Sequence, residues 1–178
     1  MYLSLCGSIS LQLKDSSVVC LPSLKVLQLI VADGSDANSV NILLAGCPIL
    51  ENLELSFCHY SFARLRVQSS LLKRLEITFE NEAGGCVEID TPGLKYLSLT
   101  KIKFSSASAF GNLCNVKEAH LAEFPILEVQ SVYPLFSLFR ALSGIKHLTL
   151  DQYLIEVTEK FSIFLCFNYI YVLFTNIT

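Results

Sequence analysis

A six-residue phrase with apolar residues at its first, fourth and sixth places recurs along the chain and limits its possible folds more than any other feature. A clear copy is Leu72–Ile77, in which Leu72, Leu75 and Ile77 are the apolar residues. A regular period in the twenties is typical of a solenoid, because one unit cannot bury its own apolar side chains and its neighbours must cover them. The first residues of successive copies stand 22 to 29 positions apart: Leu24, Leu50, Leu72, Leu94, Val116 and Ile145.

Each copy of the phrase predicts one strand of a parallel β-sheet. Side chains alternate across a strand, so the apolar places point into the core and places 3 and 5 point outward. Pro22, Pro48 and Pro92 stand two positions before their anchors and mark where the chain enters a strand, since proline has no N–H donor. The expected fold class is α/β: a leucine-rich-repeat solenoid with a parallel sheet on the concave face and short helices or second strands on the convex side.

The segments between the phrases predict the convex side. Residues 36–47 and 135–143 have apolar residues at i, i+3, i+4 and i+7, the pattern of a helix with one buried face. Two alternating pairs, Leu65/Val67 and Val87/Ile89, predict second strands in place of a helix. Residues 123–134, which hold two prolines, are expected to be an irregular loop.

The two ends of the chain depart from the repeat. Residues 1–20, with Leu3/Leu5 and Leu11/Leu13, are predicted to form one or two degenerate repeats. We expect a repeat domain over residues 1–152, with about six clear repeats, and an apolar C-terminal tail over residues 153–178. Residues 161–178 have no charged side chain and as a helix would span about 27 Å, just short of a hydrocarbon core of about 30 Å. A membrane anchor, a buried last strand pair and a tail foreign to the domain are the alternatives.

Composition narrows the classes of function. The chain is 52% hydrophobic and 16% charged with a net charge of −3, which argues against disorder and against a nucleic-acid partner. Its seven cysteines include no C-x-x-C pair, so we expect neither a disulfide framework nor a metal site. We expect most of the thiols to be buried and the protein to be cytoplasmic or nuclear. Membrane association through the tail is the alternative location. No catalytic or nucleotide-binding motif occurs, so neither enzymatic activity nor a cofactor is expected.

The outward places of the phrases form the candidate binding surface. Repeat proteins bind partners on such faces, although each side chain alone also fits a solvated polar residue on a sheet. Arg74, Tyr96 and His147 are best suited to anchor a protein partner. We predict that the partner-binding residues are Asn52, Glu54, Arg74, Glu76, Tyr96, Ser98, Glu118, His120 and His147.

The second place of the phrase is mostly lysine. Such a column either favours an acidic partner or offsets Glu54, Glu76 and Glu118 on the neighbouring places. Its members are Lys25, Glu51, Lys73, Lys95, Lys117 and Lys146.

Two longer phrases carry a resemblance to a known family. Residues 43–51 read Leu-Leu-Ala-Gly-Cys-Pro-Ile-Leu-Glu and residues 90–97 read Asp-Thr-Pro-Gly-Leu-Lys-Tyr-Leu. Both resemble the leucine-rich repeats of plant F-box proteins, most closely the subgroup that also carries a C-terminal FBD domain. The likeness covers roughly residues 8–152.

The resemblance implies recognition of a protein substrate. In that family an N-terminal F-box docks onto a Skp1-type adaptor of an SCF-type ubiquitin ligase, and the repeats present the substrate. No F-box stands before residue 8 and the apolar tail stands where the FBD is expected, so binding of a Skp1-type adaptor is not expected. The alternatives are a membrane-tethered repeat protein, a truncated product without independent function, and a receptor for a small ligand.

Overall fold

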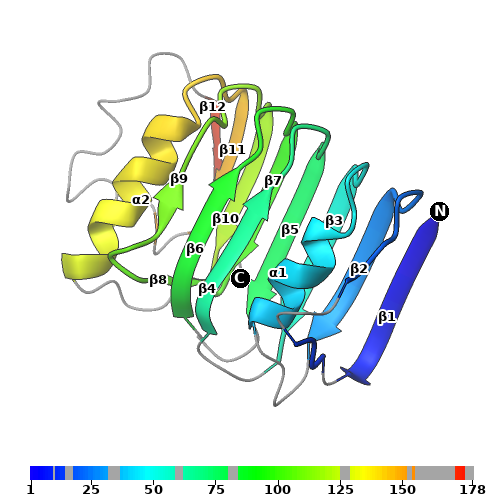
Figure 1. The fold of residues 1–178 in the computed structure, drawn as a ribbon. Helices are drawn as coiled ribbons and strands as arrows, with labels where there is room; N and C mark the ends of the chain where they lie inside the picture. The colour runs from blue at the N-terminus through cyan, green and yellow to red at the C-terminus, as the bar shows by residue number, and fades with distance from the viewer. Residues whose placement is uncertain are drawn as a thin grey trace.

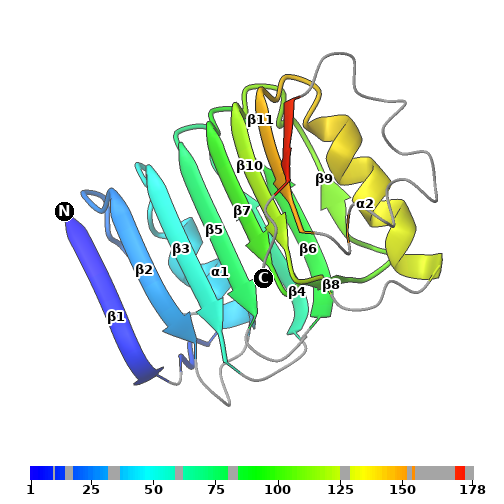
Figure 2. The ribbon, with the colours of Figure 1, turned by 180° about the vertical axis from the view of Figure 1, so that it is seen from behind.

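The computed structural model describes residues 1–9, 11–14, 18–31, 37–58, 62–79, 84–124, 129–151, 154 and 171–174. These residues form two layers (Figures 1 and 2). One layer is an eight-stranded sheet, and the other consists of a smaller sheet flanked by two helices. The predicted solenoid with a parallel sheet on one side is confirmed.

All neighbouring strands of the large sheet are parallel. Six of them, β2, β3, β5, β7, β10 and β11, begin at the third place of a phrase, which confirms the repeat. In spatial order the strands are β1 (Tyr2–Ile9), β2 (Val26–Val31), β3 (Asn52–Phe57), β5 (Arg74–Phe79), β7 (Tyr96–Thr100), β10 (Glu118–Ala122), β11 (His147–Leu150) and β12 (Tyr171–Phe174).

The fourth places of the phrases align across the sheet and form the spine of the core. Leu53 is paired with Leu27 on one side and with Leu75 on the other, and Leu75 is paired with Leu97. These side chains are at most 2% exposed, so each repeat covers the apolar residues of the one beside it. The row continues through Ala119 and Leu148.

The second layer fills the convex side as predicted. A smaller parallel sheet contains β4 (Phe62–Gln68), β6 (Gly84–Asp90) and β8 (Lys103–Phe104), and β9 (Ala109–Phe110) also pairs with β6. Helix α1 (Ala37–Ala45) contacts β4, and helix α2 (Val129–Ala141) contacts β8 and β9 (Figure 1). The layer therefore runs from a helix through a sheet to a second helix.

Two features of the sequence mislead about element boundaries. Helix α2 begins at Val129 and contains Pro134, where the sequence predicts an irregular loop up to residue 134. The proline removes one helical hydrogen bond, but the burial of Leu135, Leu138 and Phe139 outweighs that loss. Leu11 and Leu13 lie outside any strand, so the N-terminal region supplies one repeat rather than two.

The C-terminal tail is described only in part. Residues 171–174 form β12, which pairs with β11 in the same register as the other repeats. The other residues of the predicted tail, apart from Leu154, lie outside the described residues, and the domain boundary at residue 152 stays a prediction. No helix in the described part of the chain has the length and hydrophobicity that crossing a bilayer requires.

The described cysteines are free thiols in different surroundings. Cys47 and Cys86 are buried, Cys58 is partly buried, and Cys20 and Cys114 are exposed, so fewer of these thiols are buried than the sequence predicts. Burial raises the pKa of the Cys47 thiol, so it acts as a small apolar side chain of the core rather than as a nucleophile.

The leucine spine gives a direct test of the fold. Leu75→Ala should lower the free energy of unfolding by about 2–5 kcal/mol, because the side chain is fully buried and its removal leaves a cavity. The same deletion at Leu71, which is 48% exposed, should cost less than about 1 kcal/mol. Urea denaturation followed by circular dichroism measures both values, and equal losses would contradict a core position for Leu75.

Candidate functional site: the open face of the large sheet

The predicted binding residues lie in two straight rows on one side of the large sheet. We call this side, which faces away from α1 and the second sheet, the open face (Figure 2); it is the predicted concave face. Pairing across β2, β3, β5, β7, β10 and β11 puts the third places in one row and the fifth places in another. The rows are Val26–Asn52–Arg74–Tyr96–Glu118–His147 and Gln28–Glu54–Glu76–Ser98–His120–Thr149.

Most of these side chains reach solvent. Glu54, Arg74, Glu118 and His147 are exposed, and Asn52, Glu76, Tyr96 and His120 are partly exposed. Ser98 departs from the prediction, because it is only 8% exposed. Its short side chain stands between the longer Glu76 and His120 in the row and adds little to the surface.

A small hollow lies at the N-terminal half of the open face. It has a volume of about 150 Å³, and its floor includes the spine residues Leu27 and Leu53. Its sides are formed by polar and apolar side chains of β2, β3 and β5: Val26, Gln28, Asn52, Glu54, Arg74 and Glu76.

Arg74 occupies the edge of this hollow and is held by two neighbours. Its Nε lies 2.5 Å from Oε1 of Glu76, and its guanidinium carbon lies 3.8 Å from the centre of the Tyr96 ring. Burial acts to lower the pKa of Arg74, but the hydrogen bond and charge of Glu76 outweigh this effect and raise it. The side chain is still 47% exposed, so a cation in a fixed position remains open to a partner.

Hydrogen bonds also order the other side of the hollow. The Tyr2 hydroxyl donates to Oε1 of Gln28, and Nε2 of Gln28 donates to Oε2 of Glu54 over 2.8 Å. These bonds link β1, β2 and β3 across the open face, so the polar side chains adopt defined positions before any partner binds.

Comparison with known proteins identifies the family of this chain. A model of the family described as "FBD-associated F-box protein At5g56370, LRR repeats" matches residues 1–128. The chain belongs to this leucine-rich-repeat family. No protein of solved structure matches it.

The relatives with curated descriptions are longer proteins of Arabidopsis thaliana. F-box/FBD/LRR-repeat protein At4g26340 is 37% identical over 145 residues, which are 79% of this chain and 32% of the relative. F-box/LRR-repeat protein 13 is 38% identical over 110 residues, which are 58% of this chain and 24% of the relative. The chain spans between 24% and 36% of the curated relatives that head the comparison.

The large sheet of this chain presents a third row that sequence reasoning missed. Ile30, Ser56, Thr78 and Thr100 align across β2, β3, β5 and β7 one alternation beyond the fifth places. All four are partly exposed. The signal was available, because the alternation of buried and outward residues continues past the six-residue phrase in these strands.

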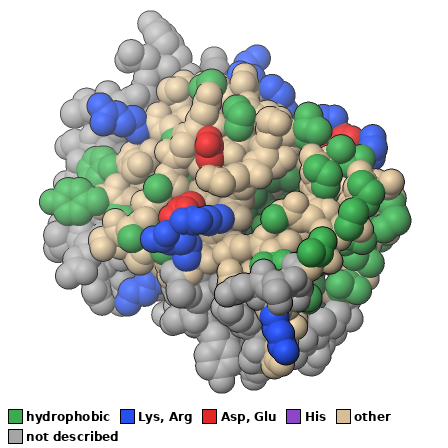
Figure 3. All heavy atoms as spheres, in the orientation of Figure 1, with side chains coloured by type: hydrophobic (Ala, Val, Ile, Leu, Met, Phe, Trp, Pro, Cys, Tyr) green, Lys and Arg blue, Asp and Glu red, His purple; other side chains and the backbone are tan. Residues whose placement is uncertain are grey.

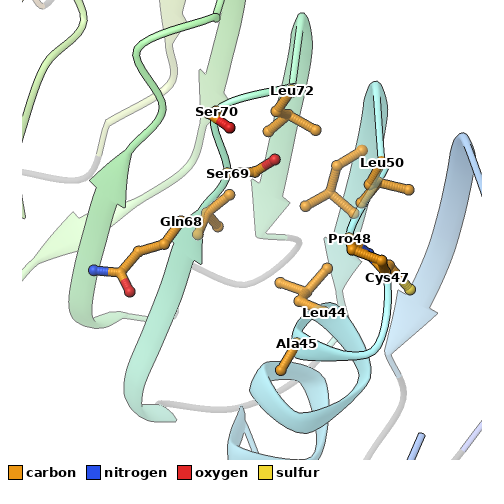
Figure 4. Close-up of a pocket in the computed structure, with 11 residues that line it drawn as sticks. Leu44, Ala45, Cys47, Pro48, Leu50, Gln68, Ser69, Ser70 and Leu72 are labelled. Carbon is orange, nitrogen blue, oxygen red and sulfur yellow. The ribbon is translucent and has the colours of Figure 1, made fainter. Parts of the chain in front are cut away.

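A larger hollow lies away from the open face, beside the C-terminal end of α1. It has a volume of about 310 Å³, and Figure 4 shows the Ser69 and Ser70 side chains facing it. None of its lining residues is charged. The hollow lies between the end of α1 and the end of β4, where the outer element of the repeat changes from a helix to a strand. The lining residues are Leu44, Ala45, Cys47, Pro48, Leu50, Leu53, Val67, Gln68, Ser69, Ser70 and Leu72.

One carboxylate pairs with two lysines along the rim where the strands begin. Oε1 of Glu51 lies 2.9 Å from Nζ of Lys25, and Oε2 of Glu51 lies 2.5 Å from Nζ of Lys73. Hydrogen bonds and charge from Lys25, and then from Lys73, lower the pKa of Glu51 from 4.5 to about 2. The Glu51 side chain is 28% exposed and both lysines are more than half exposed, so salt screens the interaction.

The titration of Glu51 tests this arrangement. Because the folded pKa is depressed, the stabilisation from Glu51 is complete above about pH 4.5 and is lost as the pH falls toward about 2. In Lys25→Met/Lys73→Met the midpoint of Glu51 should rise toward 4.5, whereas Lys103→Met should leave it unchanged. Carbon-13 NMR of the side-chain carboxyl measures each midpoint, and an ordinary midpoint in the unaltered protein would contradict the pairing.

Proposed function

We propose that the open face binds a protein segment and that the chain is the substrate-recognition part of an SCF-type ubiquitin-ligase F-box protein. The observation that carries this proposal is the register of six strands, which puts the outward side chains of distant repeats into continuous rows. Such a surface is preformed, so a partner does not have to order it when it binds.

The chemistry of the face suits one strong anchor among weaker contacts. Arg74, fixed by Glu76 and Tyr96, belongs with the arginine and tyrosine side chains that contribute most to protein interfaces. Glu54 and Glu118 carry negative charge along the same rows. Mixed charge of this kind selects a partner with a complementary pattern more than it adds affinity.

The size of the hollow favours a protein over a small ligand. Pockets that hold drug-sized molecules measure roughly 300–1,000 Å³, whereas the hollow on the open face measures about 150 Å³. A volume of this order accepts a single side chain from a partner, with the rows on either side contacting its backbone and neighbouring residues.

The link to a ubiquitin ligase rests on the family. The names of the relatives combine an F-box with leucine-rich repeats, and the matched family model is that of the repeats. In such proteins the adaptor contact belongs to the F-box, so we do not expect the repeats themselves to bind a Skp1-type adaptor. Binding of a purified adaptor to residues 1–152 would contradict this division of roles.

Charge reversal at Arg74 tests the open face. Arg74→Glu should remove the anchor, whereas Arg64→Glu is a matched control on the convex side, since both arginines pair with a glutamate and are about half exposed (47% and 49%). The unaltered chain and Arg64→Glu should capture the same proteins from plant extract. Arg74→Glu should capture at least about tenfold less of them.

A purified protein from the captured set then provides the quantitative measurement. Isothermal titration calorimetry with the three chains should give a dissociation constant about tenfold or more higher for Arg74→Glu alone. Equal affinity for all three chains would show that the open face does not bind that protein.

A further inference from the structure

Three lysines form a straight line along the rim of the open face. Each stands immediately before a strand: Lys95 before β7, Lys117 before β10 and Lys146 before β11. Their backbones are joined, because Lys117 N donates to Lys95 O over 2.8 Å and Lys146 N donates to Lys117 O over 2.9 Å. Neighbouring strands lie about 4.8 Å apart, so the three residues span about 10 Å. We call them the lysine rim.

Basic side chains gather along one border of the surface. In Figure 1 the strands of the large sheet begin at the top, and Figure 3 shows basic side chains along this upper border. An acidic side chain accompanies them only toward the N-terminal strands. Among the N-terminal strands, Glu51 pairs with Lys25 and Lys73.

The lysine rim has no such neutralising partner. All three side chains are exposed, and none forms an ion pair within the described part of the chain. Among the described residues, Lys117 Nζ contacts the Gly144 carbonyl oxygen at 3.5 Å. Like charges on adjacent strands repel, so this half of the column keeps an uncompensated positive charge.

No glutamate of the open face pairs with the lysine rim in the described part of the chain, and Glu118, which directly follows Lys117, is exposed without an ion pair. Glu54 accepts a hydrogen bond from Gln28, and Glu76 pairs with Arg74. The sequence allowed the lysine column either to favour an acidic partner or to offset Glu54, Glu76 and Glu118. Instead, Lys25 and Lys73 pair with Glu51 of the column itself. The lysine rim pairs with no glutamate of the described residues.

We infer that the lysine rim binds an acidic segment of the protein partner, a run of three or four consecutive Asp or Glu residues that crosses the starts of β7, β10 and β11. This inference rests on the proposed function of the open face as a protein-binding surface. An extended chain advances about 3.3 Å per residue, so four consecutive residues span the roughly 10 Å of the rim. Successive side chains of an extended chain point to opposite sides, so alternate carboxylates of such a run face the lysines.

Carboxylates fit this rim better than phosphates. Phosphate sites in proteins commonly use free backbone N–H groups or the two-pronged guanidinium of arginine. Here the N–H groups of Lys95, Lys117 and Lys146 already donate to carbonyl oxygens of the adjacent strand, and the rim contains no arginine. The net charge of −3 also disfavours a nucleic acid, which is attracted by an extended positive surface.

Fluorescence anisotropy with a labelled decaglutamate peptide tests the inference. Lys95→Gln/Lys117→Gln/Lys146→Gln should weaken binding by about tenfold, since each exposed charge pair contributes modestly. The matched control Lys14→Gln/Lys103→Gln/Arg140→Gln removes the same charge at exposed positions elsewhere and should bind as the unaltered chain does. Raising the salt to 1 M should abolish the difference.

Other outcomes overturn the inference. Equal weakening in both triple variants would show attraction to net charge alone, and no binding of decaglutamate by the unaltered chain would remove the acidic partner. Tighter binding of a labelled decathymidylate than of decaglutamate would identify a phosphate site instead. Capture that depends on Arg74 but not on the three lysines would leave the proposed function intact and reject only the lysine rim.

Discussion

Burial of the spine between the two layers is the interaction on which everything else in this structure depends. Leu27, Leu53, Leu75 and Leu97 pair across adjacent strands and are at most 2% exposed. A slip of one residue in any strand would turn its leucines to solvent and its polar residues to the core. Burial therefore fixes the register, and the register in turn places every row of the open face.

The open face depends on the buried spine, but the fold depends little on the side chains of the open face. Ion pairs such as Arg74 with Glu76 on the open face and Glu51 with Lys25 on its rim lie at the surface, where such pairs contribute little to stability. Substitutions among the outward residues therefore change what the face binds at small cost to the fold. A solenoid of this kind separates the residues that hold the chain together from those that meet a partner.

The same separation explains what the sequence could predict. The phrase occurs six times, and each copy specifies its own strand, so six strands of the large sheet and the positions of their outward rows follow from local pattern. The helical position of Pro134, the burial of Ser98 and the hollow beside α1 do not. Each of these arises from contacts between elements, which no single stretch of sequence contains, and the open-face hollow likewise needs side chains from three strands.

The second layer shows how the fold manages strand edges that the repeat leaves open. β4 is the edge strand of the smaller sheet, and exposed edges invite pairing with other chains. Asn41 of α1 covers it: its Nδ2 donates to Arg64 O over 3.0 Å, and its Oδ1 accepts from Arg66 N over 2.9 Å. Farther along, the Ser108 hydroxyl accepts from Val87 N over 3.1 Å on β6. Single side chains thus form hydrogen bonds with backbone groups where the outer layer changes from helix to strand and where its short strands end. Because these backbone groups are paired, connections of different length can cover one regular sheet.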